Sequence, residues 1–236
     1  MWRPIEIVEL ALNELRARAD ALDAEDAVRG IDALDELEMH ELLAHGLAAG
    51  AWGVLRERGY PASSGRKLSD RQRCDFVLTP EPDQEPEAQQ SKAMKKVAAQ
   101  PGLFDAPRPR LRLVDPRECF WLEVKVVGQF EYVQGVPGPN GSWASSLVRS
   151  LAEDVRKLSE EPGIAHGGLL LILFTSEPQV ATHDVAQALH RCLDRGLRVS
   201  GIERGAFAIR DRIGNACCSL TLASVWRNEE VDAEAE

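Results

Sequence analysis

Residues 119–127, with the sequence CFWLEVKVV, decide the fold that we expect for this chain. Aromatic and β-branched residues dominate the stretch and turn-forming residues flank it, which predicts a buried β-strand. Because side chains alternate along a strand, Glu123 and Lys125 point to the same face. A carboxylate and an ammonium group are costly to bury without a partner or a function. The two residues therefore form either an ion pair at the rim of the strand or part of a functional site.

A second short apolar run, RCDFVLT at residues 73–79, carries one acid near its centre. A strand of this kind, followed by a strand with Glu-x-Lys, resembles the PD-(D/E)XK nuclease superfamily. The positions that carry the resemblance are Asp75, Glu123, Val124 and Lys125. In that superfamily a proline often precedes the aspartate, whereas Cys74 stands there in this chain.

The resemblance implies a metal-dependent endonuclease that hydrolyses phosphodiester bonds of DNA, in restriction, DNA repair or phage defence. Asp75, Glu123 and the carbonyl oxygen of Val124 are expected to bind Mg²⁺ or Mn²⁺, since hard cations prefer oxygen ligands. Lys125 is expected to position the attacking water or to stabilise the developing charge. Cutting both strands of a duplex would favour a homodimer or a second active site.

The composition sets bounds on these expectations. The 236 residues are enough to bury the core of one domain, and we expect a single domain over residues 1–236. No run of eighteen apolar residues and no signal-peptide pattern is present, so we expect a soluble cytoplasmic protein. The five cysteines contain no C-x-x-C pair, which argues against a zinc site or a disulfide framework. A net charge of -10 argues against non-specific coating of nucleic acid but allows a locally basic cleft.

Two helices are expected before the first acid-bearing strand. Apolar residues recur at helical spacing over residues 4–22, and residues 23–30 break the pattern. A longer helix is predicted over residues 31–58. Its apolar stripe would consist of Leu34, Leu37, Ala48, Trp52 and Leu55.

Glu41 falls in the middle of this stripe, with Glu38 beside it. An acid on the buried face of a helix needs a partner or a metal ion. In the nuclease superfamily the helix before the aspartate strand often contributes such a glutamate to the metal site. Glu41 is therefore predicted to complete the site, with Glu38 as its substitute, unless the stripe is rotated and both acids are solvated.

A basic segment precedes Asp75 and follows a possible short strand at residues 61–67. Its cationic residues are Arg66, Lys67, Arg71 and Arg73. Beside an acidic cleft such a cluster would suit the phosphate backbone of DNA. The same residues could equally form an ordinary solvated turn.

Residues 80–109 are rich in Pro, Glu, Gln, Ala and Lys and are expected to form a flexible insertion between the two acid-bearing strands. Gln100, Leu103 and Phe104 lie in a QPGLF sequence that resembles the peptide by which bacterial replication and repair proteins dock on the DNA sliding clamp. An exposed Leu-Phe pair would fit a preformed hydrophobic groove. Alternatively, the two side chains fold back onto the domain.

The rest of the chain completes the expected order of elements. Gln129, Glu131 and Tyr132 follow the Glu-x-Lys strand and could line the mouth of a cleft. Asp154 falls on the apolar stripe of a helix at residues 144–159, either as a partner of a buried base or as a salt-bridged acid. The next elements are a continuously apolar central strand at residues 167–175, a helix at 179–195, and a hairpin of 203–211 with 216–225. The acidic tail from residue 229 is expected to be disordered.

From residue 31 to 175 this order is similar to the αβββαβ core of the restriction-endonuclease-like fold. We therefore expect an α/β protein with a mixed central sheet flanked by helices, an extra N-terminal helix, and a C-terminal helix and β-hairpin. The alternative function is a non-catalytic DNA- or partner-binding module of the same fold, docked on the sliding clamp through residues 100–104.

Overall fold

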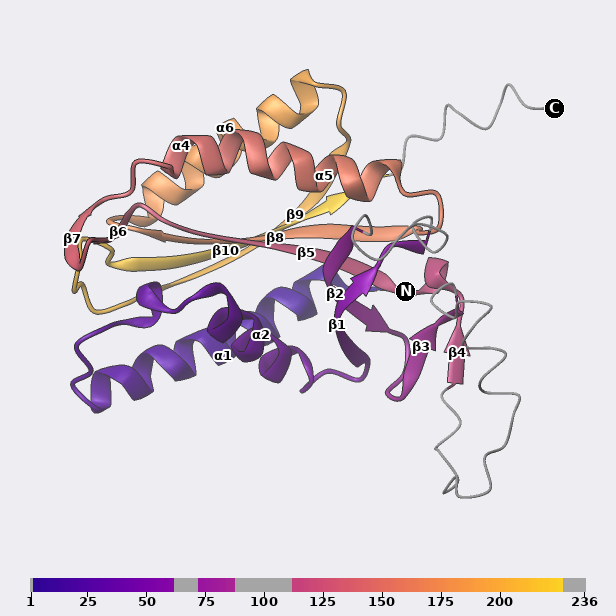
Figure 1. Ribbon diagram of the computed structural model, residues 1–236, viewed down its shortest axis with the longest axis horizontal. Helices are drawn as coiled ribbons and strands as arrows, with labels where there is room; N and C mark the ends of the chain where they lie inside the picture. Colours follow the sequence, from indigo (N-terminus) through magenta and orange to yellow (C-terminus); the bar gives the residue numbers. More distant parts are fainter. Residues whose placement is uncertain (1, 62–71, 88–111, 227–236) are drawn as a thin grey trace.

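The computed structural model describes residues 2–61, 72–87 and 112–226 of the chain. Within these ranges a six-stranded sheet has the order β1-β2-β5-β8-β10-β9 (Figure 1). Its strands are β1 (Gly53–Gly59), β2 (Arg73–Thr79), β5 (Phe120–Gly128), β8 (His166–Thr175), β9 (Val199–Ala208) and β10 (Cys217–Val225). Strands β5 and β8 run parallel, and the other neighbours run antiparallel. The expected mixed α/β architecture is therefore confirmed.

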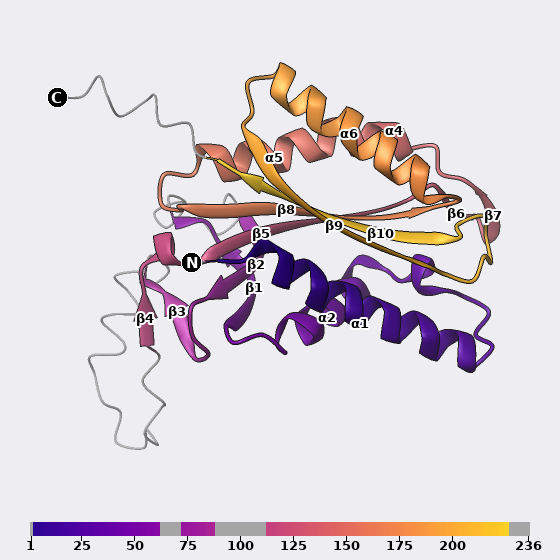
Figure 2. The ribbon, with the colours of Figure 1, turned by 180° about the vertical axis from the view of Figure 1, so that it is seen from behind.

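Helices cover both faces of the sheet (Figures 1 and 2). One face carries α1 (Pro4–Ala24), the short 3₁₀ turn η1 (Ile31–Ala33) and α2 (Glu36–Leu47). The other face carries α5 (Leu151–Glu160) and α6 (Pro178–Asp194). One turn of helix, α4 (Trp143–Ser145), and a π-helical turn, η6 (Ser146–Ser150), lead into α5. None of the helices in the described ranges is both long enough and apolar enough to cross a membrane.

Strand β8, at the centre of the sheet, is almost completely buried. Residues 167–175 of β8 are buried throughout, as expected for a strand covered by helices on both faces. Trp121, Phe76 and Phe174 are the largest side chains that are almost fully buried. The helix α5 provides the crossover that a parallel pair of strands requires between β5 and β8. Strands β5 and β8 are thus held in place by packing on both faces, and they position the polar side chains that β5 carries.

The prediction of one long helix over residues 31–58 is wrong. Helix α2 begins at Glu36, where Asp35 and Glu38 form a capping box, and it ends at Leu47. Residues 53–59 form β1 instead, paired with β2 from Gly53–Thr79 to Gly59–Arg73. The first strand of the sheet therefore precedes the segment where a short strand was predicted, and residues 62–71 lie outside the described ranges.

Of the predicted insertion at residues 80–109, the structure describes only residues 80–87. Residues 84–86 and 112–114 form β3 (Gln84–Pro86) and β4 (Arg112–Val114), which pair in parallel beside the main sheet. The part of the insertion that contains Gln100, Leu103 and Phe104 lies outside the described residues, as does the acidic tail. Clamp docking through these residues therefore stays a prediction.

A small hairpin that the sequence analysis did not predict follows β5. It consists of β6 (Phe130–Val133) and β7 (Val136–Pro139). Its turn contains Gln134 and Gly135 with φ angles of 53° and 83°, the left-handed conformation that tight two-residue hairpin turns require. The C-terminal helix and the β9–β10 hairpin, by contrast, agree with their predictions apart from shifts at their ends.

Candidate active site

Strands β2 and β5 separate after a short stretch of pairing. Their register joins only Phe76 with Leu122, Val77 with Trp121 and Leu78 with Phe120. Asp75 lies at the point of separation, where its Oδ2 accepts a hydrogen bond of 2.7 Å from the backbone N–H of Val124. The aspartate side chain thus satisfies a backbone donor of β5 where β2 no longer pairs with it.

Asp75 lies next to two side chains from other elements. His40 comes from α2 and Glu57 from β1, and the nearest ligand atoms of the three residues all lie within 4.8 Å of one another. The His40 ring is buried against the edge of Phe76, with 5.4 Å between ring centroids. Glu57 has a φ of 53°, uncommon for a residue other than glycine. Two strands, β1 and β2, and helix α2 therefore each contribute one nitrogen or oxygen ligand to the same group.

Glu123 lies on the opposite side of the sheet, toward α5. Its side chain is only 3% exposed and accepts a hydrogen bond of 2.5 Å from the Tyr60 hydroxyl. The Tyr60 ring stacks on Trp121 with 5.6 Å between centroids. Lys157 of α5 places its Nζ 4.0 Å from Glu123 Oε1 and donates to Asp154 at 2.7 Å. Glu123 is thus enclosed by an aromatic pair and one ammonium group.

Burial governs the protonation of this acid. Burial, together with the negative charge of Asp75, raises the pKa of Glu123 to about 8, against the opposing effects of the Tyr60 hydrogen bond and Lys157. Burial also acts to lower the pKa of Lys157, but its hydrogen bond with Asp154 and the charge of Glu123 raise that pKa overall. The charge of Asp75 thus favours the protonated form of Glu123.

Lys125 is half-buried and lines a cavity of about 630 Å³. Within the described part of the chain its ammonium group makes no hydrogen bond or ion pair. The two lysines near the site therefore differ, because Lys157 is paired within the protein and Lys125 is left for another partner.

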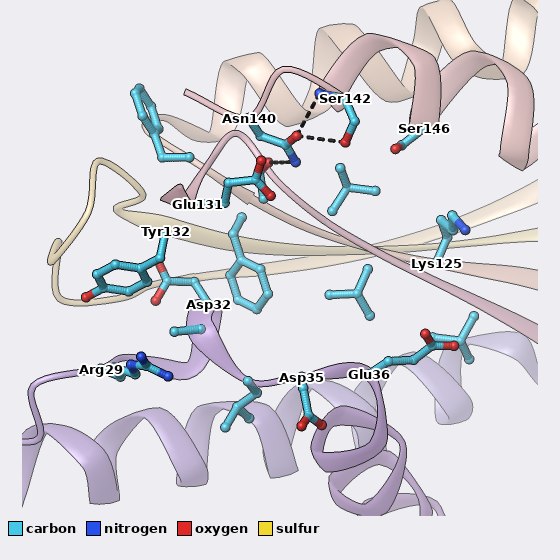
Figure 3. Close-up of a pocket in the computed structure, with 18 of the residues that line it drawn as sticks. Arg29, Asp32, Asp35, Glu36, Lys125, Glu131, Tyr132, Asn140, Ser142 and Ser146 are labelled. Carbon is cyan, nitrogen blue, oxygen red and sulfur yellow. Dashed lines mark hydrogen bonds between the residues drawn. The ribbon is translucent and has the colours of Figure 1, made fainter. Parts of the chain in front are cut away.

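The cavity extends from the separation of β2 and β5 to the β6–β7 hairpin. His40 and Val124 line it, so it reaches the Asp75 group. Figure 3 shows Lys125 and Glu36 toward one end, and Arg29, Asp32 and Tyr132 toward the other. Its acidic side chains are Asp32, Asp35, Glu36 and Glu131, and its cationic ones are Arg29 and Lys125. The lining is therefore polar, with more acids than bases.

The structure brings most of the predicted motif together but rejects the predicted face of α2. Val124 and Lys125 line the cavity, Asp75 hydrogen-bonds the Val124 N–H beside it, and Glu123 is enclosed by Tyr60 and Lys157. Glu41, in contrast, is exposed. The buried face consists of Met39, His40, Leu43, Gly46 and Leu47. The expected face was wrong because four of the five members of the predicted stripe do not belong to this helix: Leu34, Ala48, Trp52 and Leu55.

The remaining predicted residues lie outside the Asp75 group. Glu38 is held in the capping box by a 2.8 Å hydrogen bond from its N–H to Asp35. Arg73 is exposed on β2, whereas Arg66, Lys67 and Arg71 lie outside the described residues. Glu131 and Tyr132 line the cavity, whereas Gln129, named with them, does not and accepts hydrogen bonds from Ser176 instead.

The sequence analysis missed His40, Glu57, Tyr60 and Lys157. Recognising Glu57 required residues 53–59 to be identified as a strand next to Asp75. The Asp154–Lys157 spacing of three residues was a visible signal for an ion pair on one helix. No signal in the sequence pointed to the hydrogen bond between Tyr60 and Glu123, since 63 residues separate them.

No protein-family model, no curated protein and no solved structure matches this chain.

Proposed function

We propose that this protein is a metal-dependent phosphodiesterase that hydrolyses DNA. The observation that carries the proposal is the point where β2 and β5 separate: Val124 and Lys125 line a polar cavity there, and Asp75 lies beside it, hydrogen-bonded to the Val124 N–H. The Asp75, Val124 and Lys125 positions of the motif are thus neighbours at the separation of β2 and β5, and the lysine has no partner among the described residues. The proposed activity is compatible with restriction, DNA repair or phage defence.

The topology supports the same proposal. From α2 onward the chain order is α2, β1, β2, β5, α5, β8, and the corresponding strands lie side by side in the sheet as β1-β2-β5-β8. The parallel pairing of β5 with β8, across α5, is similar to the αβββαβ core of the PD-(D/E)XK superfamily. Strands β10 and β9 extend this arrangement, and α1 covers one face beside α2.

The donor set fits a divalent cation. The carboxylates of Asp75 and Glu57 suit Mg²⁺ or Mn²⁺, and the imidazole of His40 shifts the preference from Mg²⁺ toward Mn²⁺ or another transition ion. The bound cation would polarise the scissile phosphate and lower the pKa of the attacking water. Glu123 supplies a second acidic group behind Asp75, while Tyr60 and Lys157 hold it in place.

Lys125 is assigned the electrostatic role. Its ammonium group faces the cavity without a partner in the described residues, so binding a phosphate there does not require an ion pair to be broken. A positive charge fixed where negative charge develops stabilises the transition state. Lys125 lies in β5 between buried Val124 and half-buried Val126, which fixes the backbone from which that charge projects.

The proposal is tested by cleavage of linear, circular, single-stranded and branched DNA with Mg²⁺ or Mn²⁺. We expect cation-dependent cutting by the wild type and its loss in Asp75→Ala and Lys125→Ala. Calorimetry should show Mn²⁺ binding that Asp75→Ala loses and Lys125→Ala retains. The control is Asp194→Ala on the outer surface of α6, which should behave as the wild type. No cutting of any DNA together with no cation binding would overturn the proposal.

The burial of Glu123 favours one alternative, a non-catalytic module that binds DNA or a protein partner. The Glu123 carboxylate is enclosed by Tyr60 and Lys157 and does not belong to the His40–Glu57–Asp75 group. A protein of this kind would bind DNA equally well with and without a divalent cation, and Asp75→Ala would leave binding unchanged. Binding measured in EDTA and in Mn²⁺ separates the two functions.

A further inference from the structure

An aromatic side chain and a guanidinium group lie together at the hairpin end of the cavity. Arg29 packs over the Tyr132 ring, with 5.4 Å from its Cζ to the ring centroid. Both residues line the cavity, and Figure 3 shows them away from Lys125. Aromatic rings and guanidinium planes are the groups on which the bases of unpaired nucleic acid stack.

The hairpin that carries Tyr132 is fixed to the rest of the fold by Asn215. This side chain is fully buried, and it accepts from the N–H of Phe130 at 3.2 Å and donates to the Phe130 carbonyl at 3.0 Å. It also donates to Asp32 Oδ2 at 2.9 Å, which joins the hairpin to η1 across the cavity.

The turn between β9 and β10 adds to this attachment. Gly214 has a φ of +117°, and a Cβ there would lie 2.7 Å from the Phe130 ring. Glycine therefore permits the close packing of this turn on the base of the hairpin. The platform around Tyr132 is thus set in position before any ligand arrives, which lowers the entropy lost on binding.

The size and charge of the cavity argue against a duplex inside it. A volume of about 630 Å³ lies within the range of pockets that enclose one small organic ligand. Four carboxylates line it against two cationic side chains. Duplex DNA presents a dense row of phosphates, which such a lining repels, whereas a neutral base gains from stacking and from carboxylate acceptors for its amino groups.

We propose that the cavity receives an unpaired end of a nucleic acid strand, with a base stacked at Tyr132 and Arg29 and the adjoining phosphate toward Lys125. The inference that the enzyme acts on single-stranded ends or overhangs rests on the phosphodiesterase activity proposed above. The selection of unpaired over paired nucleic acid rests only on the cavity and holds for binding as well as for cleavage.

The experiment compares oligonucleotides of one sequence as a single strand, as a blunt duplex and as a duplex with an overhang. Binding is followed by fluorescence anisotropy in Ca²⁺, and cleavage is followed in Mn²⁺. We expect the single strand and the overhang to bind more tightly and to be cut faster than the blunt duplex. In Tyr132→Ala, single-strand affinity should fall by roughly 5- to 150-fold, the equivalent of stacking one base.

Matched variants separate stacking from other effects. Tyr132→Phe keeps the ring and should retain most of the affinity, and Trp226→Ala removes an exposed aromatic residue elsewhere and should change nothing. Thermal unfolding of each variant establishes that the fold is retained. Equal binding of single strand and blunt duplex, or an unchanged single-strand affinity in folded Tyr132→Ala, would overturn the inference. Tyr132-dependent binding of single strands without cleavage of any substrate would instead support this inference and reject the phosphodiesterase.

Discussion

The two acids at the separation of β2 and β5 have contrasting surroundings. Asp75 faces α2, is half-buried, and receives a hydrogen bond from the backbone of Val124 next to His40 and Glu57. Glu123 faces α5, is almost completely buried, and is held by Tyr60 and Lys157. One side of the sheet thus offers an acid to a ligand, and the other keeps an acid inside the fold.

The difference indicates that the two acids of one short motif can have separate roles, one in binding a ligand and the other in stabilising the fold. A carboxylate at the edge of a cavity can exchange water for a cation at little cost, because its neighbours are ligands rather than counterions. A carboxylate enclosed in the core must be paired or protonated, so its contribution is to position its neighbours and set the local charge. We therefore expect substitutions on the Asp75 side to affect cation binding, and those on the Glu123 side to affect stability.

The strongest test replaces Asp75 with asparagine. Asp75→Asn keeps an oxygen that can accept from the Val124 N–H but removes the charge, so the fold should be retained. Losing several kcal/mol of metal-assisted stabilisation corresponds to a fall in cleavage rate of about 10³-fold. The measurements are single-turnover cleavage in Mn²⁺, calorimetric Mn²⁺ binding and thermal unfolding. A variant that unfolds at the wild-type temperature yet binds Mn²⁺ as tightly would show that Asp75 is not a ligand.

The pH dependence of stability probes the Glu123 side in the metal-free protein. Burial and the charge of Asp75 raise the pKa of Glu123 to about 8, so the folded state holds a proton that the unfolded state releases at lower pH. The stabilisation is present below the unfolded pKa of about 4.5 and is lost as pH rises through the folded pKa, by about 1 kcal/mol per pH unit. Unfolding in urea should therefore show falling stability from pH 5 to 8.

Glu123→Gln provides the control for this pH effect. The amide does not titrate, so the fall in stability over the same pH range should be weaker than in the wild type. An identical slope in both proteins would mean that Glu123 keeps the same pKa in the folded and unfolded states. The enclosure by Tyr60 and Lys157 would then have no electrostatic consequence.

Substitutions of Lys157 and Lys125 test the same comparison through smaller changes in the free energy of unfolding. Lys157 hydrogen-bonds Asp154, which is largely buried, whereas Lys125 has no partner among the described residues. Lys157→Met leaves the Asp154 carboxylate unsatisfied and should lower the free energy of unfolding by about 1–3 kcal/mol. Lys125→Met should change it by no more than about 0.5 kcal/mol. Urea unfolding measures both, and equal losses would contradict the assignment of structural and ligand-binding roles.

The strands that carry the motif could be predicted from the sequence because their composition leaves few alternatives. Residues 73–79 and 120–128 are short runs with several β-branched and aromatic residues, residues 166–175 are an almost continuous apolar run dominated by leucine, and each forms a strand of the sheet. Alternation within such a run also indicates that Glu123 and Lys125 share a face. The local pattern was sufficient wherever burial on both faces dominated.

The pattern failed at residues 48–59, where two periodicities compete. Trp52 and Leu55 continue the helical spacing of α2, and Leu, Arg and Glu favour helices in isolation. Pairing with β2 outweighs that propensity and makes residues 53–59 a strand. Because this strand supplies Glu57, the error in secondary structure also concealed one member of the candidate metal site. The meeting of His40 with Asp75 depends on helix packing, which no local pattern contains.

The smallest expected effect concerns Glu41, which the sequence pattern had placed on the buried face. Glu41 is exposed on α2, and the helix residue beside Asp75 is His40. Glu41→Gln should therefore change the free energy of unfolding by less than about 0.5 kcal/mol and leave Mn²⁺ affinity unchanged. Glu57→Gln, the same chemical change next to Asp75, should weaken Mn²⁺ binding measured by calorimetry. The opposite outcome would mean that the cation is held from the outer face of α2, and the division of roles between the two sides of the sheet would fail with it.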